Sequence, residues 1–322
     1  MTFPSLSDIR SAAQVLDGVS LRTPVLPLSS DRWSNLLPDG AQVRMKLELF
    51  QQAGSFKARG AYLGIARLSE AEKAAGVIAA SGGNHALAVS WAAKAAGVSA
   101  TICMPEFVDP IRIDGCKAMG ADLILTPNMA SAFEAMEQGA ENGKTLIHPF
   151  EGEYMTLGSA TCGMEYVEDW PDAEVYVLPV GGSGLIGGMA CAIKQMNPNA
   201  KVIGVEPVGA DSLTRSLASG QPVVLDRIDT VADSLGAPKS LPYSFSVAQA
   251  HVDEMVHVAD DQMIDAMRLM QKNLQILAEP ACAASLTAVI GPLRDKLAGK
   301  RVGIIACGSN ISVERFSELT SG

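Results

Sequence analysis

One residue whose type and position suit covalent chemistry is a lysine at the start of an expected helix. Lys57 lies in the stretch Ser55-Phe56-Lys57-Ala58-Arg59-Gly60-Ala61. A positive charge in the first turn of a helix opposes the helix dipole, at a cost of about 0.3–1 kcal/mol. That cost disappears if the amine is bound as an imine to an aldehyde. The ordinary alternative is a solvated lysine, and the stretch alone does not separate the two.

Two stretches rich in glycine and serine each follow an expected strand and open an expected helix. The first is Ser81-Gly82-Gly83-Asn84-His85, whose free N–H groups could bind an anion such as a carboxylate. An ordinary turn capped by Asn84 would have the same sequence. The second is Pro179-Val180-Gly181-Gly182-Ser183-Gly184-Leu185, which is typical of a loop that holds a phosphate.

The second loop does not show which cofactor carries the phosphate. Gly182, Gly184 and Gly187 satisfy G-x-G-x-x-G, and Glu206 ends the next expected strand, as in a dinucleotide fingerprint. The loop alone therefore fits either NAD or another phosphorylated cofactor. A fourth stretch, Cys307-Gly308-Ser309-Asn310, follows the last expected strand. It is either a turn with a buried cysteine or a polar group directed at a cofactor ring.

The elements that must position these stretches alternate between strands and helices. Short apolar runs predict strands, and amphipathic runs that end at glycine predict helices. The expected strands are 77–80, 100–104, 123–125, 175–178, 202–205 and 302–306, and the expected helices are 84–96, 109–119, 130–141 and 185–195. This order indicates parallel sheets with right-handed crossovers. We expect two α/β units with a cleft between them, where small ligands bind at the carboxyl ends of strands.

Composition excludes several other classes of protein. The 322 residues, of which 48% are hydrophobic, are enough for one large or two medium domains. A net charge of −10 without a cluster of lysine and arginine argues against a nucleic-acid partner. Residues 1–10 do not resemble a secretory signal, and no apolar run is long enough to cross a membrane. The six cysteines form no C-x-x-C pair, which favours buried free thiols and a cytoplasmic location.

Together, the four motifs resemble the fold-type II pyridoxal-phosphate family, which contains threonine and serine dehydratases and serine racemase. The resemblance covers nearly the whole chain and decides against NAD. Further stretches that resemble the family are Leu21-Arg22-Thr23-Pro24-Val25, Lys46-Leu47-Glu48, Gly120-Ala121-Asp122, His148-Pro149-Phe150, Gly204-Val205-Glu206-Pro207, Ala232-Asp233 and Glu279-Pro280.

The resemblance implies an α/β fold of the tryptophan synthase β-like kind. Two parallel-sheet domains would hold pyridoxal 5'-phosphate in the cleft between them. We expect a large, discontinuous cofactor domain over residues 1–75 and 147–322. A small domain over 76–146 would close over the substrate. The resemblance also implies a homodimer.

The resemblance further implies roles for individual residues. Lys57 matches the lysine that forms a Schiff base with the cofactor, and its freed amine is the expected base for the α-proton. Asn84 matches the residue that hydrogen-bonds the phenolic oxygen, and Cys307 stands where the family usually has a serine facing the pyridine nitrogen. Phe56 and Glu279 are expected beside the cofactor. The phosphate loop would be Gly181, Gly182, Ser183, Gly184 and Leu185, and the loop for the substrate carboxylate would be Ser81, Gly82, Gly83, Asn84 and His85.

The implied activity is that of a dehydratase, or ammonia-lyase. It would remove water from a β-hydroxy amino acid of the threonine or serine type, giving a keto acid and ammonia. A 3-hydroxyaspartate dehydratase stays open as an alternative, as does a β-replacement or threonine synthase-like enzyme with a second substrate. Because the chain ends at Gly322, soon after the last motif, we expect no C-terminal regulatory domain and a catabolic role.

Three departures from the family pattern bear on these expectations. Gly82 stands where the racemases have a serine, so we expect elimination without efficient racemisation. Ser183 replaces a glycine of the phosphate loop, and its hydroxyl could add a phosphate contact. Racemase-like members hold a divalent cation, Mg or Ca, for which Glu206 and the carbonyl of Ala210 would be ligands here. The third ligand position is Ser212 instead of an acid, which argues against the cation because hard ions prefer charged oxygens.

Overall fold

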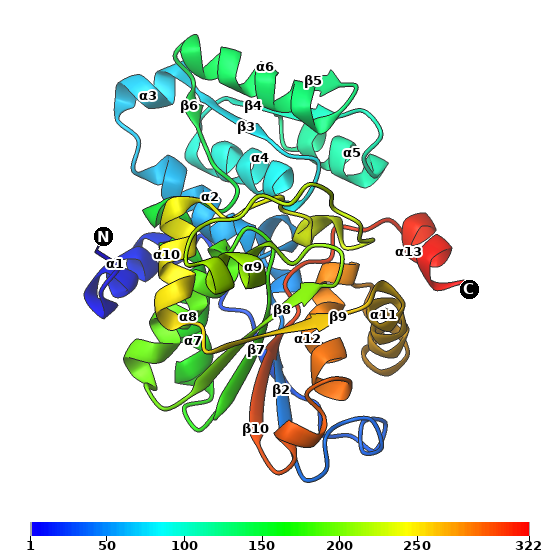
Figure 1. Cartoon of the computed structure of the whole chain (residues 1–322). Helices are drawn as coiled ribbons and strands as arrows, with labels where there is room; N and C mark the ends of the chain where they lie inside the picture. The colour runs from blue at the N-terminus through cyan, green and yellow to red at the C-terminus, as the bar shows by residue number, and fades with distance from the viewer. Residues whose placement is uncertain (1, 322) are drawn as a thin grey trace.

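The computed structural model describes residues 2–321, which fold around two separate sheets (Figure 1). The larger sheet has the strand order β1-β2-β10-β7-β8-β9. Its strands are β1 (Val25–Pro27), β2 (Gln42–Lys46), β7 (Val175–Pro179), β8 (Lys201–Pro207), β9 (Glu254–Val258) and β10 (Arg301–Ile305). All neighbouring strands are parallel except β1, which runs antiparallel to β2. We call this sheet and its helices the large unit.

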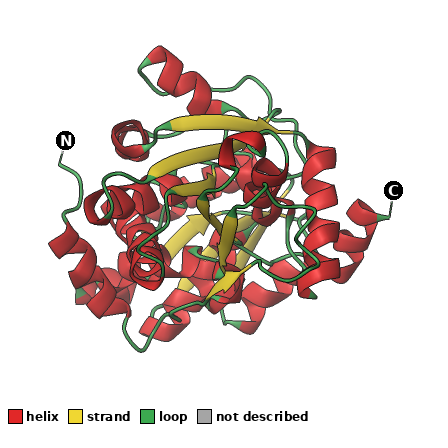
Figure 2. Cartoon of the chain, turned by 90° about the horizontal axis from the view of Figure 1, so that it is seen from below, coloured by secondary structure: helices red, strands yellow, loops and turns green. Residues whose placement is uncertain are grey.

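Helices cover both faces of the larger sheet, as its buried strands require. One face carries α1 (Leu6–Leu16), α7 (Glu153–Asp169), α8 (Gly184–Met196) and α10 (Pro242–His251), and the other carries α11 (Asp260–Leu274), α12 (Pro280–Ile290) and α13 (Val313–Thr320) (Figure 1). The short α9 (Ser212–Ser219) follows β8. Seen from below, the strands lie inside this layer of helices (Figure 2).

The smaller sheet lies above the large unit in Figure 1 and has the strand order β5-β4-β3-β6. Its strands, all parallel, are β3 (Val77–Ala80), β4 (Ala100–Pro105), β5 (Asp122–Thr126) and β6 (Thr145–Leu146). Its helices are α3 (Glu70–Ala75), α4 (Asn84–Ala96), α5 (Pro110–Ala118) and α6 (Met129–Glu141). We call these elements the small unit. The α/β fold with parallel sheets is thus confirmed, and each expected strand and helix is present.

The helix that begins at Lys57, α2 (Lys57–Ala66), contributes to the core of the small unit. Ala61 and Ile65 are fully buried in the same apolar cluster as Val77 and Ile102. Phe56, just before this helix, belongs instead to the core cluster of the large unit. The chain therefore passes between the two cores at Lys57. The domain limits 75/76 and 146/147 stay a prediction.

Two further expectations concern the cysteines and a membrane span. All six cysteines are free and buried, as expected. Within residues 2–321, no helix combines the length and apolar character needed to cross a membrane.

A buried group of charged side chains connects α2 to neighbouring elements of the large unit. Arg59 donates from Nε to Glu48 Oε2 at 2.9 Å and from Nη1 to Glu165 Oε1 at 2.7 Å. Lys46 Nζ donates to Glu165 Oε2 at 2.7 Å and to the carbonyl oxygen of Thr23 at 2.8 Å. Two cations thus face two carboxylates, and the group joins α2 to β2, α7 and the 3-10 turn at Glu48–Phe50. Because these charges are out of water, each depends on its partners.

We expect Arg59→Ala to lower the free energy of unfolding by about 3–5 kcal/mol, because it leaves the buried Glu48 carboxylate without its guanidinium. Denaturant unfolding followed by circular dichroism measures this loss. The control is Arg315→Ala, which removes a solvent-exposed pair with Glu318 and should cost less than about 1 kcal/mol. Equal losses in the two variants would show that the buried group does not anchor the helix.

Candidate active site

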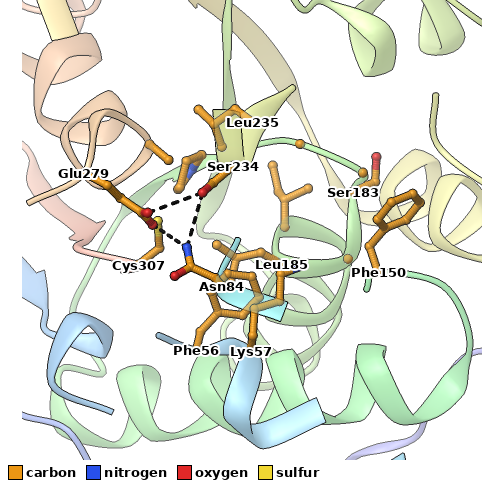
Figure 3. A pocket seen from close by; sticks show the side chains of 16 residues that line it. Phe56, Lys57, Asn84, Phe150, Ser183, Leu185, Ser234, Leu235, Glu279 and Cys307 are labelled. Atoms are coloured by element: carbon orange, nitrogen blue, oxygen red, sulfur yellow. Dashed lines mark hydrogen bonds between the residues drawn. The ribbon is translucent and has the colours of Figure 1, made fainter. Parts of the chain in front are cut away.

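A cavity lies where the carboxyl ends of β7 and β10 meet the start of α2 and α4 (Figure 3). Each of these elements supplies a loop or a first helical turn, so residues far apart in the sequence converge there. All ten residues predicted to bind a cofactor line this cavity: Phe56, Lys57, Asn84, Gly181, Gly182, Ser183, Gly184, Leu185, Glu279 and Cys307. The lining also includes Ser234, which stands after Asp233 in a stretch expected near the cofactor or substrate. Phe150 and Leu235 line the cavity too and were not predicted as site residues.

Lys57 presents a partly buried amine to the cavity. Its Nζ donates a hydrogen bond to the carbonyl oxygen of Pro149 and lies 5.0 Å from the centre of the Phe56 ring. Burial lowers the pKa of Lys57 to about 8, and Cys307 and Glu279 only partly oppose this effect. A lysine that loses its proton near neutral pH is a better nucleophile and base than a solvated one.

The glycine-rich loop after β7 forms a tight cradle at the start of α8. A Cβ added at Gly182 would lie 2.4 Å from the ring of Phe150, and one at Gly184 would lie 2.8 Å from the Phe150 carbonyl oxygen. The first N–H groups of a helix have no partner within it, and the helix dipole favours an anion there. The loop can therefore hold a phosphate. Ser183 has a left-handed φ of 70°, and its hydroxyl lies 2.5 Å from that of Ser240.

The loop at residues 81–85 is held in place by its own side chains. Ser81 Oγ accepts a hydrogen bond from the N–H of Gly83 at 3.1 Å, and His85 Nε2 lies 2.8 Å from the carbonyl oxygen of Ile147. Burial, followed by the charge of Lys57, lowers the pKa of His85 to about 3. The imidazole is thus neutral, and its Nε2–H donates to Ile147. A Cβ added at Gly82 would lie 2.6 Å from Cγ1 of Val108.

A polar network closes the cavity on the side of Glu279 (Figure 3). Asn84 Nδ2 donates to Glu279 Oε1 at 2.5 Å, and Asn310 Nδ2 donates to Asn84 Oδ1 at 2.6 Å. Ser234 Oγ donates to Glu279 Oε2 at 3.3 Å. Arg112, on α5 of the small unit, reaches the same group and lies 3.7 Å from Glu279 Oε2. Sequence reasoning missed Arg112, since nothing in its amphipathic helix distinguishes it from a solvated residue.

The predicted cation ligands are used for another purpose. The buried Glu206 carboxylate accepts hydrogen bonds from the N–H groups of Leu213 and Thr214 and from the Thr214 hydroxyl, at 2.7, 3.0 and 2.7 Å. Burial raises the pKa of Glu206 to about 7. Asp211 is paired with Arg215. In the described part of the chain, no group of three or more His, Cys, Asp or Glu side chains could hold a metal. Glu206, one of the two predicted ligands, thus already has hydrogen-bond partners in its own chain.

The chain is similar to proteins of one family along nearly its whole length. A family model described as "Pyridoxal-phosphate dependent enzyme" matches residues 19–308. A phenylserine dehydratase from Ralstonia pickettii is 39% identical over 98% of this chain and 96% of that protein. An L-threonine ammonia-lyase from Thermotoga maritima is 39% identical over 98% and 78%. The structure of maize serine racemase superposes with a TM-score of 0.92 at 30% identity and covers 98% of this chain and 97% of that one.

The neutral state of His85 predicts a pH-dependent contribution to stability. Its pKa is about 3 in the fold and near 6.5 in the unfolded chain, so unfolding takes up a proton below pH 6.5. Between pH 7 and pH 5 this proton should remove about 2 kcal/mol of stability from the wild type, but not from His85→Gln. Denaturant unfolding of the cofactor-free protein at both pH values measures the difference. Parallel pH curves for the two proteins would contradict a buried, neutral imidazole.

Proposed function

The chain belongs to the pyridoxal-phosphate dependent enzyme family, and from this premise we propose that it eliminates water from a β-hydroxy amino acid. The enamine that remains takes up water again and gives a 2-keto acid and ammonia. The family resemblance drawn from the sequence is thereby confirmed. The observation that carries the proposal is Lys57, a partly buried amine of lowered pKa that lines one cavity together with the glycine-rich loop. Two relatives at 39% identity, named as a dehydratase and an ammonia-lyase, support the same reaction.

The cavity fits pyridoxal phosphate at three points. The amine of Lys57 suits an aldehyde, and the first N–H groups of α8, which begins at Gly184 directly after the glycine-rich loop, suit a phosphate. Burial keeps the Cys307 thiol neutral by raising its pKa, so it places no negative charge opposite a ring nitrogen. When bound, the cofactor stabilises negative charge at the α-carbon of the amino acid. We assign Phe56, Asn84, Gly181, Ser183, Leu185 and Glu279 to the same cofactor site.

The groups around the cavity can accept the α-proton and stabilise the ammonium that results. Lys57 must be neutral to accept the α-proton. Burial lowers its pKa and so makes the neutral amine easier to form. The Pro149 carbonyl oxygen already accepts a hydrogen bond from Nζ, so it can hold the ammonium once the proton has been taken. The loop of Ser81, Gly82, Gly83, Asn84 and His85 is the proposed site for the substrate carboxylate.

The charges near this loop favour a substrate with an uncharged β-substituent. A second carboxylate, as in 3-hydroxyaspartate, would need a cationic partner. Arg112 is engaged by Asp233 and Glu279, and burial lowers the pKa of His85 to about 3 and that of His148 to about 4. Serine, threonine and aryl analogues such as phenylserine are therefore the first substrates to test. The 3-hydroxyaspartate and β-replacement reactions are the second candidates.

The decisive experiment is the visible absorbance spectrum of the wild type beside Lys57→Ala, before and after candidate β-hydroxy amino acids are added. We expect a cofactor band in the wild type that is absent from the variant and changes with one substrate as keto acid accumulates. Because the amine must be neutral to attach cofactor, the attachment rate to apoprotein should rise with pH up to about 8. No band after addition of pyridoxal phosphate would refute the proposal. Keto acid formed only with a second substrate would favour β-replacement.

We expect elimination without efficient racemisation, since Gly82 offers no proton on the face where the related racemases have a serine. Gly82→Ser alone should not create a racemase, because Val108 occupies the space that a Cβ needs. Gly82→Ser combined with Val108→Ala is the matched variant that removes this obstacle. Chiral chromatography of serine recovered after long incubation measures the outcome. D-serine that forms in the wild type as fast as pyruvate would contradict the prediction.

We also propose that the enzyme works without a divalent cation, because Glu206 already accepts three hydrogen bonds from its own chain. Exhaustive chelation should leave both activity and the thermal unfolding midpoint unchanged. If magnesium or calcium raised the midpoint of the wild type but not that of Glu206→Gln, the cation site would be real. The homodimer and the cytoplasmic location stay proposals, which sedimentation and cell fractionation can test.

A further inference from the structure

A buried arginine of the small unit reaches across to the large unit beside the cavity. Arg112 lies on α5, and its Nη1 donates to Asp233 in the 3-10 turn Asp233–Leu235. Its Nε donates to the carbonyl oxygen of Asn310 at 3.1 Å. The same guanidinium holds the loop for the substrate carboxylate, because Nη1 also donates to the Gly82 carbonyl oxygen at 3.1 Å. Only 6% of Arg112 is exposed, so these contacts replace its hydration.

A second contact strengthens the same junction. Asp109, which caps α5, accepts a hydrogen bond from the N–H of Ser312 at 2.9 Å. Both Asn310 and Ser312 belong to the segment that leaves β10, whereas Asp109 and Arg112 belong to the small unit. The first turn of α5 is thus fixed to the large unit at two points.

The guanidinium of Arg112 also contacts the hydrogen-bond network at the proposed cofactor site. Its Nη2 lies 3.7 Å from Glu279 Oε2, and Glu279 Oε1 accepts from Asn84 Nδ2 (Figure 3). Asn310 Nδ2 donates to Asn84 Oδ1, so both ends of the Asn84 amide are held by groups that also contact Arg112 or its partners. The position of the small unit and the orientation of Asn84 are therefore linked through shared hydrogen bonds.

We propose that Arg112 is a positioning residue that holds the small unit closed on the large one and, through Glu279, fixes the orientation of the Asn84 amide at the cavity. Only one part of this inference rests on the proposed function, namely that Asn84 lies beside a cofactor. The closure itself depends on contacts within this chain.

The charge balance of the network gives this role a measurable consequence. Burial raises the pKa of Glu279, and Arg112 opposes that rise while Asp233 adds to it. Loss of Arg112 would leave two neighbouring carboxylates, and Glu279 would then hold its proton to a higher pH. A protonated Glu279 accepts less well from Asn84. The charged or titratable groups that face Glu279 are Arg112 of α5, Asp233, Lys57 of α2, Cys282 of α12 and Cys307.

The first test uses the apoprotein, so that it does not depend on cofactor or substrate. Hydrogen–deuterium exchange of residues 81–85 and 110–118 is compared among the wild type, Arg112→Gln, Arg112→Lys and Lys117→Gln. Lys117 lies on the same helix and is exposed, so its variant is the matched control for a lost positive charge. We expect exchange on the order of tenfold faster in Arg112→Gln, an intermediate effect in Arg112→Lys, and no change in the control.

The second test uses the holoenzyme. The cofactor absorbance of Arg112→Gln should change with pH in a range where the wild type is constant, and its KM should rise more than its kcat falls. Asp233→Asn should add little to Arg112→Gln in the double variant if the two residues act as a pair. Arg112→Lys keeps the charge but not the fork of donors, so its spectrum should lie nearer the wild type.

The inference is overturned if Arg112→Gln matches Lys117→Gln in both exchange and spectrum. It is also overturned if Arg112→Gln lowers only the unfolding midpoint and leaves exchange in residues 81–85 unchanged. A wild type that shows no cofactor band would defeat the proposed function instead, and the exchange result for the apoprotein would still decide the role of Arg112.

Discussion

The site depends on an amine that is kept out of water. Desolvation lowers the pKa of Lys57 to about 8, and no carboxylate lies close enough to restore it. Two residues further along α2, Arg59 is buried too, but Glu48 and Glu165 satisfy it and raise its pKa. One short helix thus carries a cation that is fully paired and an amine that is free to react. The paired cation fixes the helix, and the fixed helix holds the amine in the cavity.

The parallel sheets explain why so much of the site converges at one place. Successive strands point the same way, so the turns that follow β3, β7 and β10 lie at their carboxyl ends. Each of these turns carries small residues where a side chain would clash, as the Cβ contacts at Gly182 and Gly308 show. The site therefore depends on close packing of these loops as well as on the side chains that line the cavity.

Sequence alone was sufficient for the elements and motifs whose signal is local. Strands such as Val77–Ala80 and Val175–Pro179 are unbroken apolar runs, and the loop that contains Gly182 is defined by its glycines. Contacts across the cleft were not predictable. Arg112 meets Asp233, which lies far along the chain, and no local pattern reports such a pair. Val108 beside Gly82 and Ser240 beside Ser183 were missed for the same reason, because their partners are set by packing.

The chain passes from the core of the large unit to that of the small unit at Lys57, which connects the position of the small unit to the reactive amine. Phe56 packs in the core of the large unit, whereas Ala61 and Ile65 pack in that of the small unit. A movement of the small unit must therefore act on α2 near its first turn, where the reactive amine lies. Arg59 ties the same turn to the 3-10 turn Glu48–Phe50 and to α7 of the large unit. In the closure that we propose, the amine therefore stays with the cavity, and the loop at residues 81–85 is the part of the site that moves with the small unit.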